Sequence, residues 1–114
     1  MNREVLERYA EYYNKQVGRK FPCSNQIVTC GIITDDKDKA LAVMNKKGAI
    51  IELQSYYGID WKLNNEKWMW RNWGESSKGC RFYKVIVDEN VNEHIFNCLV
   101  RACLPNYCCS FEII

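Results

Sequence analysis

The sequence predicts a single α+β domain over residues 1–114, with an N-terminal helix and a C-terminal helix packed on a mostly antiparallel sheet that ends in a β-α-β unit. A length of 114 residues allows one hydrophobic core and is too short for two ordinary domains. The composition, 47% hydrophobic and 26% charged, is typical of soluble globular proteins and excludes disordered and collagen-like classes. Helical periodicity near both ends, with β-branched or alternating segments between them, gives the α+β class.

The first predicted element is an amphipathic helix over residues 2–17. Its apolar side chains recur at steps of three and four residues. They are Val5, Leu6, Tyr9, Tyr12, Tyr13 and Val17. Asn2 is placed to cap this helix and Gly18 to end it. Residues 21–26 are then predicted to form a connection, because they combine Pro, Ser and Asn.

Residues 27–33, I-V-T-C-G-I-I, are rich in β-branched side chains, which predicts a buried strand. The next segment allows two interpretations. We favour a strand over residues 39–44 that turns at residues 45–48 into a second strand over residues 49–53. The alternative is a helix over residues 35–47, capped by Asp35 and ended by Gly48.

All four tryptophans fall in residues 61–73, W-K-L-N-N-E-K-W-M-W-R-N-W. If Asn64 and Asn65 form a two-residue turn, Trp61 lies opposite Trp68 in a hairpin. One face of that hairpin then collects Ile59, Trp61, Leu63, Trp68 and Trp70, and the other collects Asp60, Lys62, Lys67, Met69 and Arg71. We favour this hairpin over a helix for residues 65–73, because the helix would separate Trp68 from the other tryptophans.

The end of the chain is predicted to contain a strand, a helix and a strand. Residues 74–79, G-E-S-S-K-G, form a loop, and residues 81–87 form a strand. A helix over residues 91–103 is capped by Asn90 and followed by a break at Pro105. Residues 107–114 form the last strand, so that the segment is compatible with a β-α-β unit.

Neither the cysteines nor His94 predicts catalysis. The chain has seven cysteines, an odd number, and no export signal precedes them, so we expect reduced, buried thiols in a cytoplasmic protein. His94 and Cys98 share a helix face, and Cys103, Cys108 and Cys109 follow, but this spacing matches no usual zinc pattern. Phosphate-binding and nucleophile motifs are also absent from the sequence. We therefore predict no catalytic residues, no cofactor and no bound metal, although a Cys/His metal protein remains an alternative.

The charge distribution favours a binding function. The formal net charge is only +2, but residues 62–84 hold six Lys and Arg against two Asp and Glu. Interface centres are enriched in Trp, Tyr, Met and Arg, all of which occur in residues 56–73. Trp73, beside a loop, is expected to be the most exposed tryptophan. The candidate binding residues form an aromatic and basic patch: Tyr57, Lys67, Trp68, Trp70, Arg71, Trp73, Lys78 and Arg81.

These observations predict a non-enzymatic protein-binding domain, an inhibitor or adaptor that occupies the surface of a larger protein partner. The alternative is a single-stranded nucleic-acid-binding module, with bases stacked on Trp and phosphates held by Lys and Arg. No apolar run is long enough to span a membrane, so we expect no membrane association. In its size and its lack of catalytic motifs the chain resembles inhibitors carried by phages and other mobile elements, such as anti-CRISPR proteins. That resemblance implies a role against a defence system.

Overall fold

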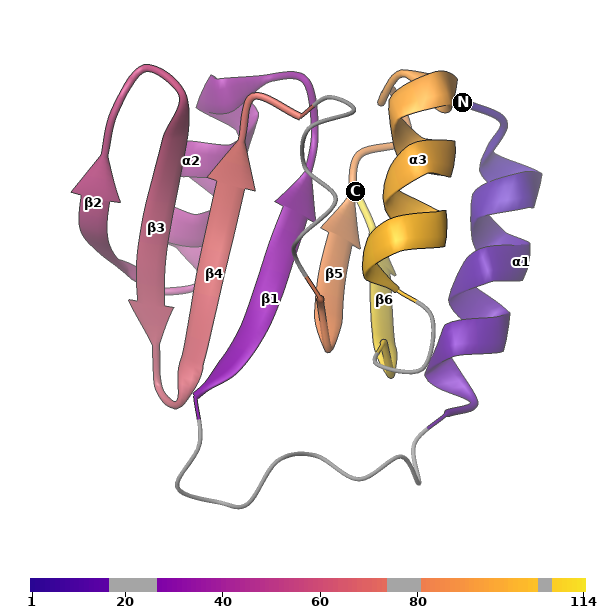
Figure 1. The fold of residues 1–114 in the computed structure, drawn as a ribbon, viewed down its shortest axis with the longest axis horizontal. Coiled ribbons are helices and arrows are strands. Elements are labelled where there is room, and N and C mark those ends of the chain that lie inside the picture. The colour runs from indigo at the N-terminus through magenta and orange to yellow at the C-terminus, as the bar shows by residue number, and fades with distance from the viewer. Residues whose placement is uncertain (17–26, 74–80, 105–107) are drawn as a thin grey trace.

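The computed structural model describes residues 1–16, 27–73, 81–104 and 108–114, which form one mixed sheet and three helices. The strand order is β2-β3-β4-β1-β5-β6 (Figure 1). In chain order the elements are α1 (Arg3–Asn14), β1 (Val28–Ile33), α2 (Lys37–Lys46), β2 (Ile50–Gln54), β3 (Gly58–Leu63), β4 (Glu66–Arg71), β5 (Lys84–Val87), α3 (Glu93–Cys103) and β6 (Ser110–Ile113). The predicted α+β class is confirmed. The predicted connection at 21–26, loop at 74–79 and break at Pro105 lie outside the described residues.

The sheet is mixed rather than mostly antiparallel. Strands β2, β3 and β4 form an antiparallel meander, whereas β1 is parallel to both β4 and β5. The pair β5 and β6, connected through α3, is also parallel, as the predicted β-α-β unit requires. Strand β1 lies in the interior of the sheet, and its last four residues are all buried, as is typical of a parallel strand covered on both faces.

Helix α2 corrects the favoured interpretation of residues 39–44 as a strand. The residues form a helix whose cap is Asp36, one residue after the Asp35 that the helical alternative assigned. The Asp36 carboxylate accepts hydrogen bonds from the backbone N–H groups of Asp38 and Lys39. Ala40 and Met44, four residues apart, are completely buried, so tertiary packing of this helix face outweighs its short length. Gly48 ends the helix region with a positive φ of 81°.

The other two helices begin at asparagine caps. The side chain of Asn2 accepts from the backbone N–H of Glu4 at 2.8 Å, which confirms the predicted start of α1. The cap of α3 is Asn92 rather than the predicted Asn90, since the Asn92 side chain accepts from the backbone N–H of Ile95. Both caps satisfy N–H groups that a helix start leaves without an intrahelical partner.

The tryptophan hairpin is confirmed in its register. Trp61 pairs with Trp68, and Ile59 pairs with Trp70, across the antiparallel ladder of β3 and β4. Asn64, in the two-residue turn, has a φ of 55°, a conformation that asparagine accepts more readily than most residues. The alternation of apolar and charged side chains therefore sets this register, as a strand with one buried face requires.

The helices cover the two faces of the sheet unequally. In Figure 1, α2 lies behind the sheet and α3 lies in front of β5 and β6. Tyr9 of α1 contacts Phe96 of α3, and both Tyr13 and Phe96 contact Phe111 of β6, so α1 and α3 share this front face. No described helix covers the front of β2, β3 and β4. None of the helices in the described ranges has the length and apolar character needed to cross a bilayer.

Candidate functional site

The four tryptophans belong to the core, which corrects the expected contact surface. They are between 1% and 5% exposed; Trp73 has the highest value of the four, as expected, but at 5% it is buried too. The predictions that Trp73 is exposed and that Trp68 and Trp70 offer contact surface are therefore wrong. Trp73 packs edge-to-face on Phe82, a neighbour that sequence spacing does not reveal.

Hydrogen bonds from the indole N–H groups fix three of these rings. Trp70 donates to the backbone carbonyl of Thr34, and Trp73 donates to that of Ile32, both at 2.9 Å. Trp68 donates to the Glu66 carboxylate at 3.0 Å. A buried tryptophan needs such a partner, and the first two bonds join β4 and the segment after it to the end of β1.

The remaining predicted binding residues are partly accessible. Tyr57 is exposed, Lys67 and Arg71 are half-buried, and Arg81 is exposed near the start of β5. Asp60 holds both cations of β4, with Arg71 Nη1 at 2.8 Å and Lys67 Nζ at 3.8 Å from its carboxylate oxygens. Tyr57 lies at the same end of this hairpin as Arg71, because its carbonyl accepts from the backbone N–H after Arg71. Lys78 lies outside the described residues.

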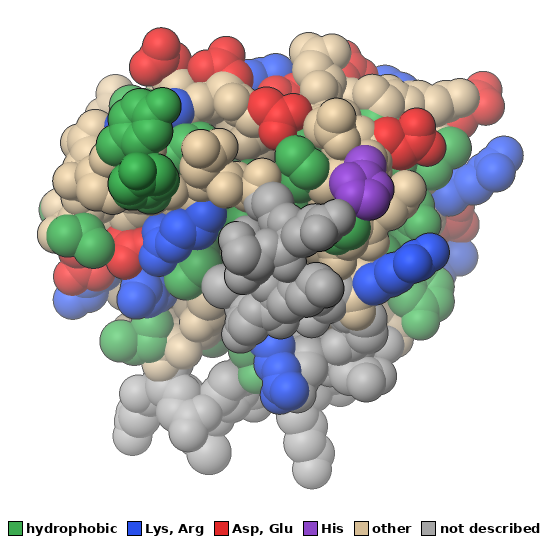
Figure 2. All heavy atoms as spheres, turned by 45° about the horizontal axis from the view of Figure 1, so that its top comes forward, with side chains coloured by type: hydrophobic (Ala, Val, Ile, Leu, Met, Phe, Trp, Pro, Cys, Tyr) green, Lys and Arg blue, Asp and Glu red, His purple; other side chains and the backbone are tan. Residues whose placement is uncertain are grey.

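An exposed apolar surface lies beside these cations, along the edge strand β2 and the turn that follows. We call it the β2 edge surface, and its members are Ile50, Ile51, Leu53, Tyr56 and Tyr57. These side chains are between 45% and 76% exposed, and the two tyrosine rings contact each other edge-to-face. On the side of the molecule where β2, β3 and β4 lie, Figure 2 shows hydrophobic side chains next to Lys and Arg side chains.

A β-bulge organises this surface. The register of β2 against β3 shifts between Ile51 and Leu53, so that Ile50 pairs with Lys62 and Leu53 pairs with Asp60. Lys62 and Asp60 are two residues apart and share the front face, and the bulge therefore places Ile50 and Leu53 on that face together. Without the shift, Leu53 would face the side of α2.

A hollow lies on the other face of the edge, between β2 and α2. It has a volume of about 330 Å³ and is lined by Leu41, Ala42, Asn45, Ala49, Ile51 and Trp61. Ile51 thus connects the exposed edge with the hollow. The strand offers apolar contacts on both of its faces, which sequence analysis missed because nothing in the sequence places β2 at the edge of the sheet. The adjacent apolar residues in I-I-E-L were the available signal.

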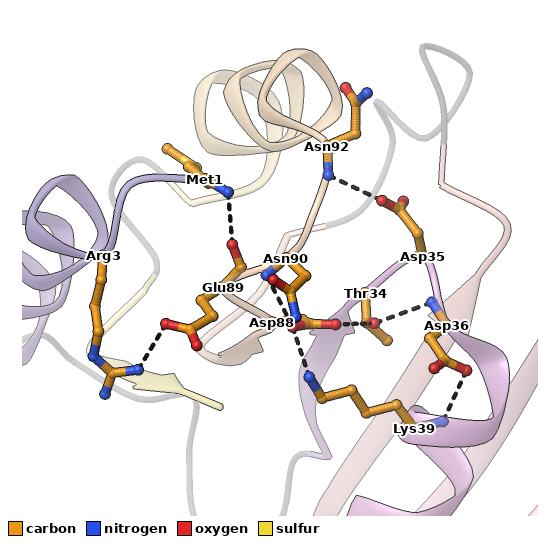
Figure 3. Close-up of polar contacts among 10 residues, drawn as sticks. All are labelled: Met1, Arg3, Thr34, Asp35, Asp36, Lys39, Asp88, Glu89, Asn90 and Asn92. Atoms are coloured by element: carbon orange, nitrogen blue, oxygen red, sulfur yellow. Dashed lines mark hydrogen bonds and ion pairs between the residues drawn. The ribbon is translucent and has the colours of Figure 1, made fainter.

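A polar cluster lies at the carboxyl ends of β1 and β5 (Figure 3). There the connection from β1 leads to α2 behind the sheet and the connection from β5 leads to α3 in front, an arrangement that often holds ligands. The buried Asp88 carboxylate accepts from Thr34 Oγ1 at 2.7 Å, Lys39 Nζ at 2.8 Å and the backbone N–H of Asn90 at 3.0 Å. Because its oxygens are occupied, Asp88 acts as a structural link between β1, α2 and β5.

The protonation of Asp88 follows from the same contacts. Burial raises the pKa of this carboxyl, but the hydrogen bonds from Lys39, Asn90 and Thr34 outweigh burial and leave the pKa below its usual value. Asp35 accepts from the backbone N–H of Asn92, and Arg3 pairs with the carboxylate of Glu89 (Figure 3). The acidic residues of this region are therefore engaged in links between elements.

The described cysteines are not grouped with other metal-ligand side chains, and Cys30 is a buried thiol. In the parts of the chain with described coordinates, no three His, Cys, Asp or Glu side chains are grouped as metal ligands, and His94 Nε2 lies 3.9 Å from Cys98 Sγ. Burial, with a contribution from Glu66, raises the pKa of the Cys30 thiol to about 12. Four described cysteines are buried free thiols, as expected for small apolar side chains: Cys30, Cys103, Cys108 and Cys109.

Comparisons of this chain with protein-family models, with curated proteins and with solved structures gave no match.

Proposed function

We propose that the protein is a non-enzymatic protein-binding domain and that its contact surface is the β2 edge surface together with the neighbouring cations of β3 and β4. One observation carries this proposal. Of the large apolar side chains exposed in the described residues, five lie within residues 50–57, on one strand and its turn. Contiguous exposed apolar patches with a polar rim are typical of protein-interaction sites.

The composition of the surface supports the same function. Tyrosine combines large contact area with few rotatable bonds, and Tyr56 and Tyr57 are the two most exposed large apolar side chains described. Full burial of an aliphatic side chain such as Leu53 contributes about 1.5–3 kcal/mol. The half-buried Arg71 and Lys67 supply a polar rim whose charge is partly neutralised by Asp60.

The inhibitor role expected from the sequence remains part of this proposal, since a domain that occupies a partner surface can block it. The nucleic-acid alternative is weakened, because its stacking platform consisted of tryptophan rings that are buried.

Affinity capture from an extract of the source organism tests the proposal. The bait is the intact protein, compared with Tyr56→Ala/Tyr57→Ala and with the control Tyr12→Ala, whose tyrosine is 55% exposed on α1. We expect one dominant protein partner that the control retains and the double variant loses. Equal recovery of that partner by all three baits, or recovery of no partner, would contradict the proposal.

A further inference from the structure

We propose that the β2 edge accepts an extended segment of the partner protein, apolar and acidic at alternating positions, which adds to the sheet as a further strand beside β2. This inference rests on the proposed function and specifies how the partner binds. Such strand addition uses backbone hydrogen bonds for affinity and side-chain contacts for specificity.

The backbone of β2 is available for this pairing. In the described part of the chain, β2 pairs only with β3, and it is the first strand in the sheet order. An edge strand presents unpaired N–H and C=O groups along its free side. All five residues of β2 are exposed, so that no described element shields this side.

The two faces of β2 offer different surroundings to the alternating side chains of an extended segment. Ile50 and Leu53 lie on the front face, and Ile51 lies on the other face beside the hollow of about 330 Å³. Successive side chains of an added strand point alternately to these two faces. An alternating segment can therefore place its apolar side chains over the hollow beside Ile51 and its acidic side chains on the front face, beside Ile50 and Leu53 and toward Lys62.

The charges around the edge favour an acidic partner. Residues 37–71, which form α2, β2, β3 and β4, contain seven Lys and Arg against four Asp and Glu, and two of these cations, Lys39 and Lys47, pair with Asp88 and Glu112 of other elements. Lys62, the register partner of Ile50, lies directly opposite Lys67 on β4. Like charges at opposite positions of a ladder repel each other. Lys62 has no ion pair among the described residues, so an added carboxylate on the front face would offset this repulsion.

A second copy of the chain fits the same edge less well. Glu52 lies at the middle of β2, between Ile50 and Gln54. Two copies that pair antiparallel about the strand centre would place one Glu52 opposite the other, and the bulge would interrupt the ladder at the same point. These features disfavour self-association and leave a different protein as the occupant.

Peptide titration followed by two-dimensional NMR of the isotope-labelled full chain tests the inference. The first probe is a peptide of about eight residues that alternates Val and Glu, matched to the usual length of strands. The controls are the same peptide with Lys in place of Glu and the Val/Glu peptide with methylated backbone nitrogens. We expect amide shifts concentrated in residues 49–57 with the first probe, and binding at least about tenfold weaker with each control.

Protein variants separate strand addition from nonspecific charge attraction. Lys62→Glu should weaken binding of the Val/Glu peptide and strengthen binding of the Val/Lys peptide, whereas Arg8→Glu, on exposed α1, should change neither. Leu53→Asp should abolish the shifts. Ile27→Asp should retain them, because Ile27 is 66% exposed and precedes β1, which is separated from β2 by the strands β3 and β4.

Three results would overturn the inference. They are the absence of shifts at the highest soluble peptide concentration, equal binding of the methylated peptide, and concentration-dependent dimers that β2 variants abolish. If capture still depends on Tyr56 and Tyr57 while the peptide fails, the proposed function stands and strand addition is wrong. If capture fails as well, both are wrong.

Discussion

Trp61 and Trp68 are register partners across the β3–β4 ladder, and both rings are buried on the face that α2 covers. The tryptophans of residues 61–73 therefore form part of the core. Cross-strand aromatic pairs stabilise a sheet through side-chain packing. The exposed residues of the same hairpin are polar, namely Lys62, Asn64 and Asn65, and five of the seven exposed large apolar side chains in the described residues come from β2 and its turn.

Replacement of Trp73 by Ala should strongly destabilise the fold. The change removes a buried ring from its contact with Phe82 and removes the donor to the Ile32 carbonyl. We expect a loss of about 3–5 kcal/mol in the free energy of unfolding, measured by urea denaturation. The control Tyr57→Ala should change it by less than about 0.5 kcal/mol, because that side chain is exposed. An unchanged midpoint for Trp73→Ala would contradict the assignment of this ring to the core.

The turn between β3 and β4 depends on Asn64. Its φ of 55° disfavours β-branched side chains, so Asn64→Val should reduce the free energy of unfolding by about 1–3 kcal/mol. Asn64→Gly should be close to neutral, since glycine adopts positive φ without steric cost. Thermal denaturation of both variants measures the difference. Equal stability of the two variants would show that residue 64 does not need a positive φ for this turn to form.

The hairpin shows what the sequence can predict about this fold. Its register followed from alternation and from a turn that asparagine permits, both of which are local properties. The start of α1 at Asn2 was predictable for the same reason. Helix α2 was assigned to a strand because its stability depends on buried contacts of Ala40 and Met44, which local propensity does not contain.

The candidate site was less predictable than the fold. The exposure of Trp73 depends on Phe82, a residue of another segment, and the exposure of Ile50 depends on the position of β2 at the sheet edge. Both are consequences of strand order, which the sequence pattern leaves open. The insertion of β1 between β4 and β5 is the step that decides that order.

Gly31 and Phe82 are predicted to be coupled in stability. A Cβ atom at Gly31 would lie 2.8 Å from two ring atoms of Phe82, which is completely buried. Gly31→Ala should therefore cost about 1–3 kcal/mol through overpacking. In a double-mutant cycle with Phe82→Leu, the cost of Gly31→Ala should decrease, because the smaller side chain leaves room for the methyl group. Additive effects in urea denaturation would show that the two positions are independent.

The Asp88 link should make stability depend on acid pH. Its pKa is lowered in the folded protein, so its contribution to stability is complete above the unfolded pKa of about 3.9. As the pH falls below that value, the unfolded chain binds the proton first and the contribution is lost. Asp88→Asn removes the negative charge beside Lys39 and converts one of the two oxygens that accept from Lys39 and Thr34 into a donor, which should cost about 1–3 kcal/mol at pH 7.

The difference in free energy of unfolding between the wild-type protein and Asp88→Asn should therefore narrow as the pH falls below about 4, in urea titrations at several pH values. Asp38→Asn is the matched control, because Asp38 is exposed and lies on the same helix as Lys39. It should change stability by a few tenths of a kcal/mol, through the loss of a charge near the start of α2. A pH-independent difference for Asp88→Asn would mean that packing, rather than the charge of Asp88, joins β1, α2 and β5.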